Sequence, residues 1–197
     1  ERQEIFDDKG KLKDKIAYEY YSILINTKEI NDDQRKELAI LLRKRKIERL
    51  KILNNYLIES GSSLQKLIKN NLEQAAKLFD KVVRFNDKRI NVTGTIPVYL
   101  DLDGYLHIYM RHVEEMKVNK HFEHKDNFQW HEDDVLTVIE NVIKKLDEDI
   151  QKHFSENPTL NFSRYGKMSI YYQGDYYTMH IEPTGRISTF HKNKKKI

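Results

Sequence analysis

Residues suited to acid–base chemistry are concentrated in the second half of the chain. All eight histidines lie between His107 and His191, and the ordinary pKa of imidazole lets it accept or donate a proton near neutral pH. Cationic and hydroxyl side chains are interspersed among them, including Arg111, Lys125 and Thr189. Metal-free RNA cleavage needs these types: a base for the ribose 2′-OH, an acid for the leaving 5′-oxygen, and cations around the phosphorane.

Other chemistries fit the sequence less well. Cysteine is absent, which excludes disulfides and thiolate catalysis. Neither GxGxxG, GxxxxGK[ST] nor GxSxG occurs, so the motif-defined NAD, ATP and serine-hydrolase classes are excluded. His121, His124 and His131 are candidate metal ligands, but their spacing is not that of a helical HExxH site. A structural role is the alternative for them, and we predict no metal and no cofactor.

Composition divides the chain at Thr95/Ile96. Residues 1–95 carry 21 Lys+Arg and 15 Asp+Glu (21 − 15 = +6), whereas residues 96–197 carry 14 and 16 (14 − 16 = −2). This asymmetry predicts two units with different roles. No apolar run approaches the roughly 18 residues that a membrane span needs, and no signal-peptide core is visible.

Apolar residues recur at helical spacing through residues 1–95, which we interpret as a delivery, linker or assembly segment. The pattern predicts helices over Lys9–Asn26 and Gln34–Glu59 and a third, continuous helix from Gly61 to Val82. The basic run Arg43–Lys46 is either a solvated helix surface or a patch that contacts phosphate.

Residues 96–197 are predicted to form an α+β domain in which a long helix packs on a mainly antiparallel sheet. The helix follows Glu132. The predicted strands are Ile96–Leu102, Tyr105–Val113, Lys167–Gln173, Tyr176–Glu182 and Arg186–Phe190. In the second strand, alternation places His107 and Arg111 on one face and His112 on the other, so we expect only one of these histidines in a site.

Three segments together resemble a known family. The order YLHIYMRHV, then Lys125 in HKDNF, then an amphipathic helix, then YYQGDYYTMHIEPTGRISTF resembles the barnase–EndoU–colicin–RelE-like ribonuclease superfamily. Its members occur widely as C-terminal toxin domains of polymorphic, contact-dependent or phage-associated proteins. The resemblance covers roughly residue 96 to the end of the chain.

The resemblance implies roles for individual residues. His112 would be the general base or acid, with His107 as the alternative. Arg111 and Lys125 would stabilise the scissile phosphate, and Thr189 would hydrogen-bond a phosphate oxygen or orient a histidine. The remaining candidates contact the substrate: Tyr177 or Tyr172 stacks on a base or assists proton transfer, and Arg186 and His191 complete the binding set.

The resemblance also implies a substrate, a partner and a location. The substrate would be RNA, with tRNA a candidate, cleaved without metal to a 2′,3′-cyclic phosphate. A cognate immunity protein would silence the enzyme in the cell that makes it. The protein would act in the cytoplasm, or in a target-cell cytoplasm after delivery within a larger secreted protein. The alternative is a non-catalytic adaptor module that binds protein or RNA.

Overall fold

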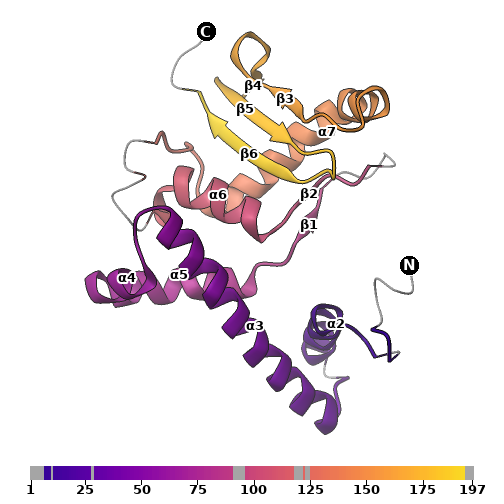
Figure 1. The fold of residues 1–197 in the computed structure, drawn as a ribbon, viewed down its shortest axis with the longest axis vertical. Coiled ribbons are helices and arrows are strands. Elements are labelled where there is room, and N and C mark those ends of the chain that lie inside the picture. Colours follow the sequence, from indigo (N-terminus) through magenta and orange to yellow (C-terminus); the bar gives the residue numbers. More distant parts are fainter. Residues whose placement is uncertain are drawn as a thin grey trace. The chain divides into compact units, whose positions relative to one another are not determined.

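The computed structural model describes residues 7–9, 11–27, 29–90, 96–117, 122 and 125–193. The chain forms two compact units, Glu1–Asn54 and Asn55–Ile197, and each is considered by itself (Figure 1). None of the helices in the described ranges is both long and apolar enough to cross a membrane.

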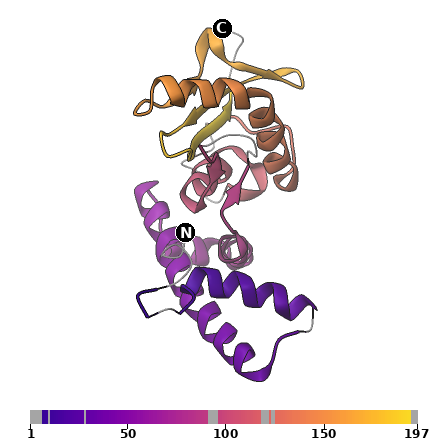
Figure 2. The same ribbon diagram turned by 90° about the vertical axis from the view of Figure 1, so that its right-hand side faces the viewer.

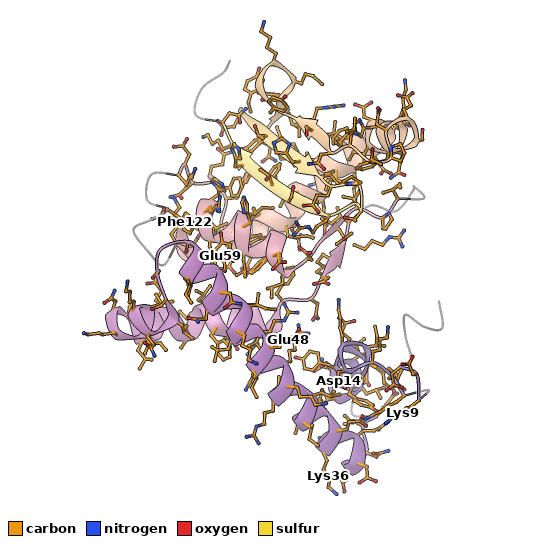
Figure 3. All side chains as sticks on the ribbon, in the orientation of Figure 1. Lys9, Asp14, Lys36, Glu48, Glu59 and Phe122 are labelled. Atoms are coloured by element: carbon orange, nitrogen blue, oxygen red, sulfur yellow. The ribbon has the colours of Figure 1, made fainter. Side chains whose placement is uncertain are left out.

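The first unit pairs helix α2 (Asp14–Thr27) with most of helix α3 (Asp32–Glu59). Asn31 and Gln34 cap α3 reciprocally, each side chain accepting the other's backbone N–H. Asp14 points toward α3 (Figure 3), where Lys44 donates to it at 2.8 Å. Arg45 lies over the Tyr18 ring at 4.5 Å. Two members of the basic run are therefore engaged within the unit.

The predicted third helix is two helices, so that prediction is wrong. Helix α4 spans Leu64–Asn70 and helix α5 spans Leu72–Arg84. Between them Asn71 takes an extended conformation with φ −158°, and its side chain accepts a hydrogen bond from the Gln74 N–H. Asparagine is among the best N-capping residues, so it starts a new helix where apolar periodicity alone suggests continuation.

Helix α5 belongs with the C-terminal unit. Lys81 on α5 forms an ion pair with Glu132, and the Phe85 ring stacks on Tyr105 with centroids 4.3 Å apart. Strand β1 (Lys88–Arg89) then pairs antiparallel with β2 (Tyr99–Leu100). The compact units therefore divide between Asn54 and Asn55. This differs from the compositional boundary at Thr95/Ile96, because these tertiary contacts cross that boundary.

The predicted strand Tyr105–Val113 is instead helix α6 (Leu102–His112), and this prediction is corrected. Asp101 caps the helix by accepting a hydrogen bond from the Gly104 N–H at 2.9 Å. Apolar residues are buried at helical as well as alternating spacings: Leu102, Tyr105, Leu106, Ile108, Tyr109 and Met110. Burial on nearly all sides hides the helical period, because a helix enclosed on every side has no polar stripe.

The rest of the C-terminal unit confirms the expected α+β class. Helix α7 (Glu132–Glu156) is followed by the antiparallel strands β3 (Phe162–Arg164), β4 (Ile170–Tyr172), β5 (Asp175–Ile181) and β6 (Ile187–Lys192). Strand β5 pairs with all three others. Short 3₁₀ turns occupy Glu114–Met116 and Gly166–Met168. Strand β3 is the one strand of this sheet that the sequence pattern did not predict.

Helix α7 covers one face of the sheet (Figures 1 and 2). Its Asp149 binds Arg164 on β3 at 2.9 Å, and its Asn141 donates to the Tyr172 hydroxyl at 3.4 Å. The strand residues on this face, Tyr177, Met179, Ile181 and Phe190, are fully buried. Helix α6 packs along β6. The polar side chains of these two elements therefore lie close to one another.

Two glycines with similar backbones allow the packing at the β5–β6 turn to be tested. Gly185 has φ +88° and a Cβ there would lie 1.7 Å from the Pro97 carbonyl oxygen, whereas Gly174 has φ +94° with nothing within 4 Å. We expect Gly174→Ala to lower the free energy of unfolding by about 1–2 kcal/mol from left-handed strain alone. Gly185→Ala should cost clearly more, because backbone must also move. Urea denaturation of both variants makes the comparison, and equal losses would contradict the close approach.

Candidate active site

The site is built from one face of α6 and the neighbouring strand β6. His107 and Arg111 are four residues apart on α6 and so lie on one helix face. His112 follows, and its ring stacks on the His191 ring of β6 with centroids 5.4 Å apart and planes at 25°. The helix thereby brings both predicted histidines to one region, which the strand interpretation did not allow.

His107 is a half-buried imidazole among cations. Its pKa is lowered to about 4, first by burial and then by the charges of Arg111, His191, Arg186 and Lys125. Four residues predicted from separate parts of the sequence therefore act on one ring. At pH 7 the His107 ring is neutral and can accept a proton, and its surroundings favour an anion.

His112 is almost completely buried, at 8% exposure. Its Nδ1 lies 3.0 Å from the Asp126 carbonyl oxygen, and because a carbonyl only accepts, Nδ1 carries the proton. Burial lowers the pKa of His112 to about 4, although the Asp126 hydrogen bond opposes this. The ring is thus neutral and fixed at Nδ1, with Nε2 as its basic nitrogen.

His191 is held in the same way. Its Nδ1 lies 3.0 Å from the Lys192 carbonyl oxygen and donates to it, so Nε2 is the ring nitrogen left for other partners. His191 is also more accessible than His112, since its side chain is only partly buried. Of the two stacked rings, His191 is therefore the one placed to meet a ligand.

Arg111 has two contacts that orient its guanidinium. Its Nε donates to the Tyr56 hydroxyl at 3.2 Å, and its guanidinium carbon lies 5.3 Å from the centre of the Phe122 ring. The nearby carboxylates of Glu114 and Glu115 bind Asn127 and His131, respectively. The carbonyl oxygen of Lys125 accepts a hydrogen bond from Lys117 Nζ at 2.6 Å. This bond joins the backbone at Lys125 to the segment that follows α6.

Thr189 lies on β6 opposite His180 on β5. His180 Nδ1 is joined to Ser163 Oγ on β3 by a 2.8 Å hydrogen bond. Burial, and then the charge of His191, lowers the pKa of His180. His180 and Ser163 are not among the residues predicted from the sequence. The alternation of β5, which directs Tyr176, Thr178 and His180 to one face, was the signal that could have found His180.

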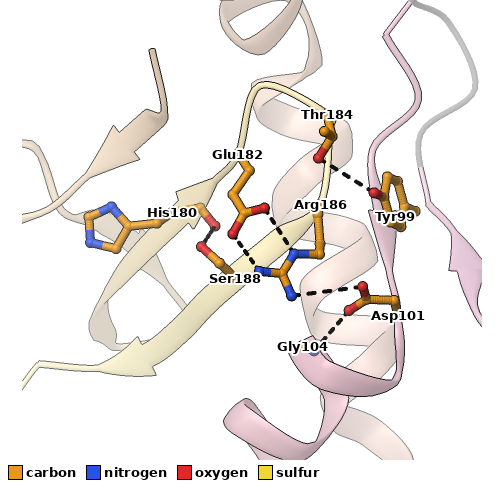
Figure 4. A network of polar contacts seen from close by, with 8 residues as sticks. All are labelled: Tyr99, Asp101, Gly104, His180, Glu182, Thr184, Arg186 and Ser188. Atoms are coloured by element: carbon orange, nitrogen blue, oxygen red, sulfur yellow. Dashed lines mark hydrogen bonds and ion pairs between the residues drawn. The ribbon is translucent and has the colours of Figure 1, made fainter. Parts of the chain in front are cut away.

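Arg186 is part of a structural network (Figure 4). It binds Glu182 through two nitrogens at 2.9 and 2.5 Å and lies 3.8 Å from Asp101, the residue that caps α6. These carboxylates, Glu182 first, raise the pKa of Arg186. The guanidinium is thus already neutralised, and its role in this structure is to hold the start of α6 against the β5–β6 turn.

Tyr172 and Tyr177 lie on the sheet face that α7 covers, so we remove them from the candidate site. Tyr177 is fully buried, with its ring 5.3 Å from both the Phe190 and Trp130 rings. Tyr172 is 9% exposed and contacts Asn141 and Lys145 of α7. Their burial denies both rings the contact with an RNA base that was predicted.

Two of the three candidate metal ligands, His121 and His124, lie outside the described residues. His131, the third candidate, donates to Glu115 at 2.9 Å. Across the ranges that the structure describes, no group of three or more His, Asp or Glu side chains could hold a metal ion.

Comparison of the chain with family models, with curated proteins and with solved structures finds no match. The geometry of the site is a neutral imidazole beside the oriented guanidinium of Arg111, with a second imidazole whose Nδ1 is fixed.

The buried histidines predict that stability falls with acid. His112 has a folded pKa of about 4 and an unfolded pKa of about 6.5. Between these values the unfolded chain binds more protons, so the free energy of unfolding decreases as pH drops. We expect His112→Gln to reduce the difference in unfolding free energy between pH 7 and pH 5 by about 1–2 kcal/mol.

The control is His131→Gln, because Glu115 raises the pKa of exposed His131. That histidine stabilises the fold at low pH, so its loss should leave the pH 7 to pH 5 difference unchanged or slightly larger. Urea titrations at the two pH values measure this. An undiminished difference in His112→Gln would mean that the His112 ring is not buried in its neutral form.

Proposed function

We propose that the C-terminal unit is a metal-independent endoribonuclease whose active site is His107, Arg111, Lys125 and His191. The observation that carries the proposal is the position of His107: a half-buried neutral imidazole whose pKa is lowered by the charges of Arg111, His191 and Lys125. Unbalanced positive charge around a base suits a substrate that brings its own negative charge next to the proton to be removed.

In the proposed reaction the His107 ring takes the proton from a ribose 2′-OH, and the 2′-oxygen attacks the adjacent phosphorus. Arg111, oriented by Tyr56 and Phe122, and Lys125 stabilise the added negative charge on the phosphorane oxygens. His191 enters the reaction as an imidazolium with a proton on each ring nitrogen; it donates the Nε2 proton to the leaving 5′-oxygen and keeps the Nδ1 proton on the Lys192 carbonyl. The products are a 2′,3′-cyclic phosphate and a 5′-hydroxyl, so atoms and charge balance without a metal.

A bound substrate phosphate would also change the pKa of His107. A pKa of about 4 makes His107 a weak base in the empty site, whereas a general base works best with a pKa near the operating pH. A phosphate beside Arg111 and Lys125 offsets their charge and raises the pKa of His107 toward neutrality. The base would thus become stronger only when substrate is present.

This proposal changes the roles expected of the two neighbouring histidines. His112 is too buried for direct contact with RNA, and we assign it as a positioning residue that holds the His191 ring by stacking. Thr189 lies on β6, two residues before His191. Its role as a hydrogen-bond donor to the phosphate stays a prediction. Arg186 acts on the site by holding the position of α6, because its charge is paired with Glu182.

A toxin role follows from the resemblance described above, and we propose it on that basis. Such an enzyme would act in the cytoplasm of a target cell, and its producer would need an immunity protein. A partner with acidic side chains could occupy the cation-lined site, because the same charges that attract phosphate would attract carboxylates.

The test is cleavage of total tRNA at pH 7 in EDTA by the whole chain. We expect discrete fragments that end in a cyclic phosphate, and at least 100-fold slower cleavage by His107→Gln and by His191→Gln, because acid–base catalysis typically contributes 10²–10⁴-fold. His153→Gln is the matched control: it lies in the same unit, where its Nε2 donates to Leu160 O, and it should cleave like the unmodified chain.

Two results would contradict the proposal. If His107→Gln keeps full activity, His107 is not the base. If the unmodified chain leaves every RNA intact, the catalytic proposal fails and the non-catalytic adaptor module becomes the better interpretation.

A further inference from the structure

The sheet face opposite α7 carries hydroxyls, imidazoles and exposed aromatic rings. Strand pairing places Ser163 beside His180, His180 beside Thr189, Thr178 beside His191, and Tyr171 beside Tyr176. These seven residues share one face because side chains alternate along each strand and the residues between them are buried against α7. We call this set the hydroxyl face.

This face carries two ring pairs, and one ring of each pair is exposed. Tyr171 and Tyr176 have centroids 5.2 Å apart. Tyr165, which follows β3, lies 5.8 Å from the His180 ring. Tyr171 and Tyr165 are each 62% exposed. Rings so exposed contribute little to the core, but they offer flat surfaces on which nucleobases can stack.

The remaining positions on the hydroxyl face suit a polyanion. The strand residues whose side chains lie on this face carry hydroxyl or imidazole groups, and none of them carries a carboxylate. The acidic residue of β5, Asp175, lies on the other face, where it binds Lys192 at 2.9 Å. Thr178 is the covered member of the set, and its hydroxyl donates to Asn193 at 2.8 Å.

The hydroxyl face is continuous with the candidate active site. His191 belongs to both, since it lies across from Thr178 on β5 and stacks on His112 of α6. Tyr176, Thr178 and His180 follow at every second residue of β5, a spacing of roughly 6.6 Å. A chain that crosses the strands at His191 would have Tyr171 toward one end of β5 and His180 with Tyr165 toward the other.

We propose that the substrate is single-stranded RNA, bound across the hydroxyl face with bases stacked on Tyr171 and Tyr165 and its scissile phosphate at His191. This inference rests on the proposed function and specifies its substrate class. Single strands are favoured over duplexes because stacking on a protein ring needs an unstacked base, and a duplex hides the faces of its bases.

Binding is measured by fluorescence anisotropy with the whole chain and a labelled 2′-O-methyl RNA of about 12 nucleotides, within the usual range of site sizes. This probe has no 2′-OH and cannot be cleaved. We expect the single strand to bind at least 5-fold more tightly than its duplex. Tyr171→Ala and Tyr165→Ala should each weaken single-strand binding about 5-fold or more, because stacking of one base contributes that much.

Matched variants separate stacking from other effects. Tyr171→Phe keeps the ring and should bind like the unmodified chain. Tyr20→Ala removes a tyrosine of α2 that is 48% exposed and 5.5 Å from the Tyr21 ring, and it should also leave affinity unchanged. Equal affinity of Tyr171→Ala and the unmodified chain, equal affinity for duplex and single strand, or no binding of either overturns the inference.

Cleavage measured separately distinguishes the two proposals. Cleavage that depends on His107 but has the same KM in Tyr171→Ala would overturn this inference and leave the nuclease standing. Tyrosine-dependent binding without cleavage of ordinary RNA would overturn the nuclease and leave the binding face.

Discussion

The ion pairs of Arg186 determine where the site forms. Arg186 begins the return from the β5–β6 turn, is bound through two nitrogens to Glu182, and reaches Asp101, whose carboxylate also caps α6. One guanidinium therefore joins the turn of the sheet to the first turn of the helix. Burial raises the pKa of Asp101, and the Gly104 N–H and Arg186 oppose that shift only in part.

From that junction, helix geometry positions everything else on α6. His107 and Arg111 follow Asp101 at positions that share one face, and His112 ends the helix against β6 and the Phe128 ring, with centroids 5.7 Å apart. Phe128 also contacts Phe190 and Trp130. Aromatic rings thus pack against the stacked histidines. A site built on a helix and a strand is more precisely held than one on loops.

Placing imidazoles beside cations has a cost in stability. Both His107 and His112 are neutral in the folded protein because burial and neighbouring charges oppose their protonation. The fold therefore loses stability in acid at the groups that the proposed chemistry needs. Residues selected for folding alone would place carboxylates beside these rings, as Glu115 lies beside His131. The contrast between His131 and His107 in one domain is an argument for function at His107.

The sequence by itself determined the class of the fold, the long helix after Glu132, the last three strands, and the residue types from which a site could be made. These follow from period, turn residues and inventory, which are local properties. It predicted a strand where α6 stands, because burial on nearly all sides leaves no polar stripe, and it extended one helix through the Asn71 cap.

Three features depend on the tertiary structure. His107, Arg111 and His191 lie close together, Tyr172 and Tyr177 are covered by α7, and Arg186 is paired with carboxylates. Each of these depends on contacts between residues distant in the sequence, and such contacts have no period along the chain.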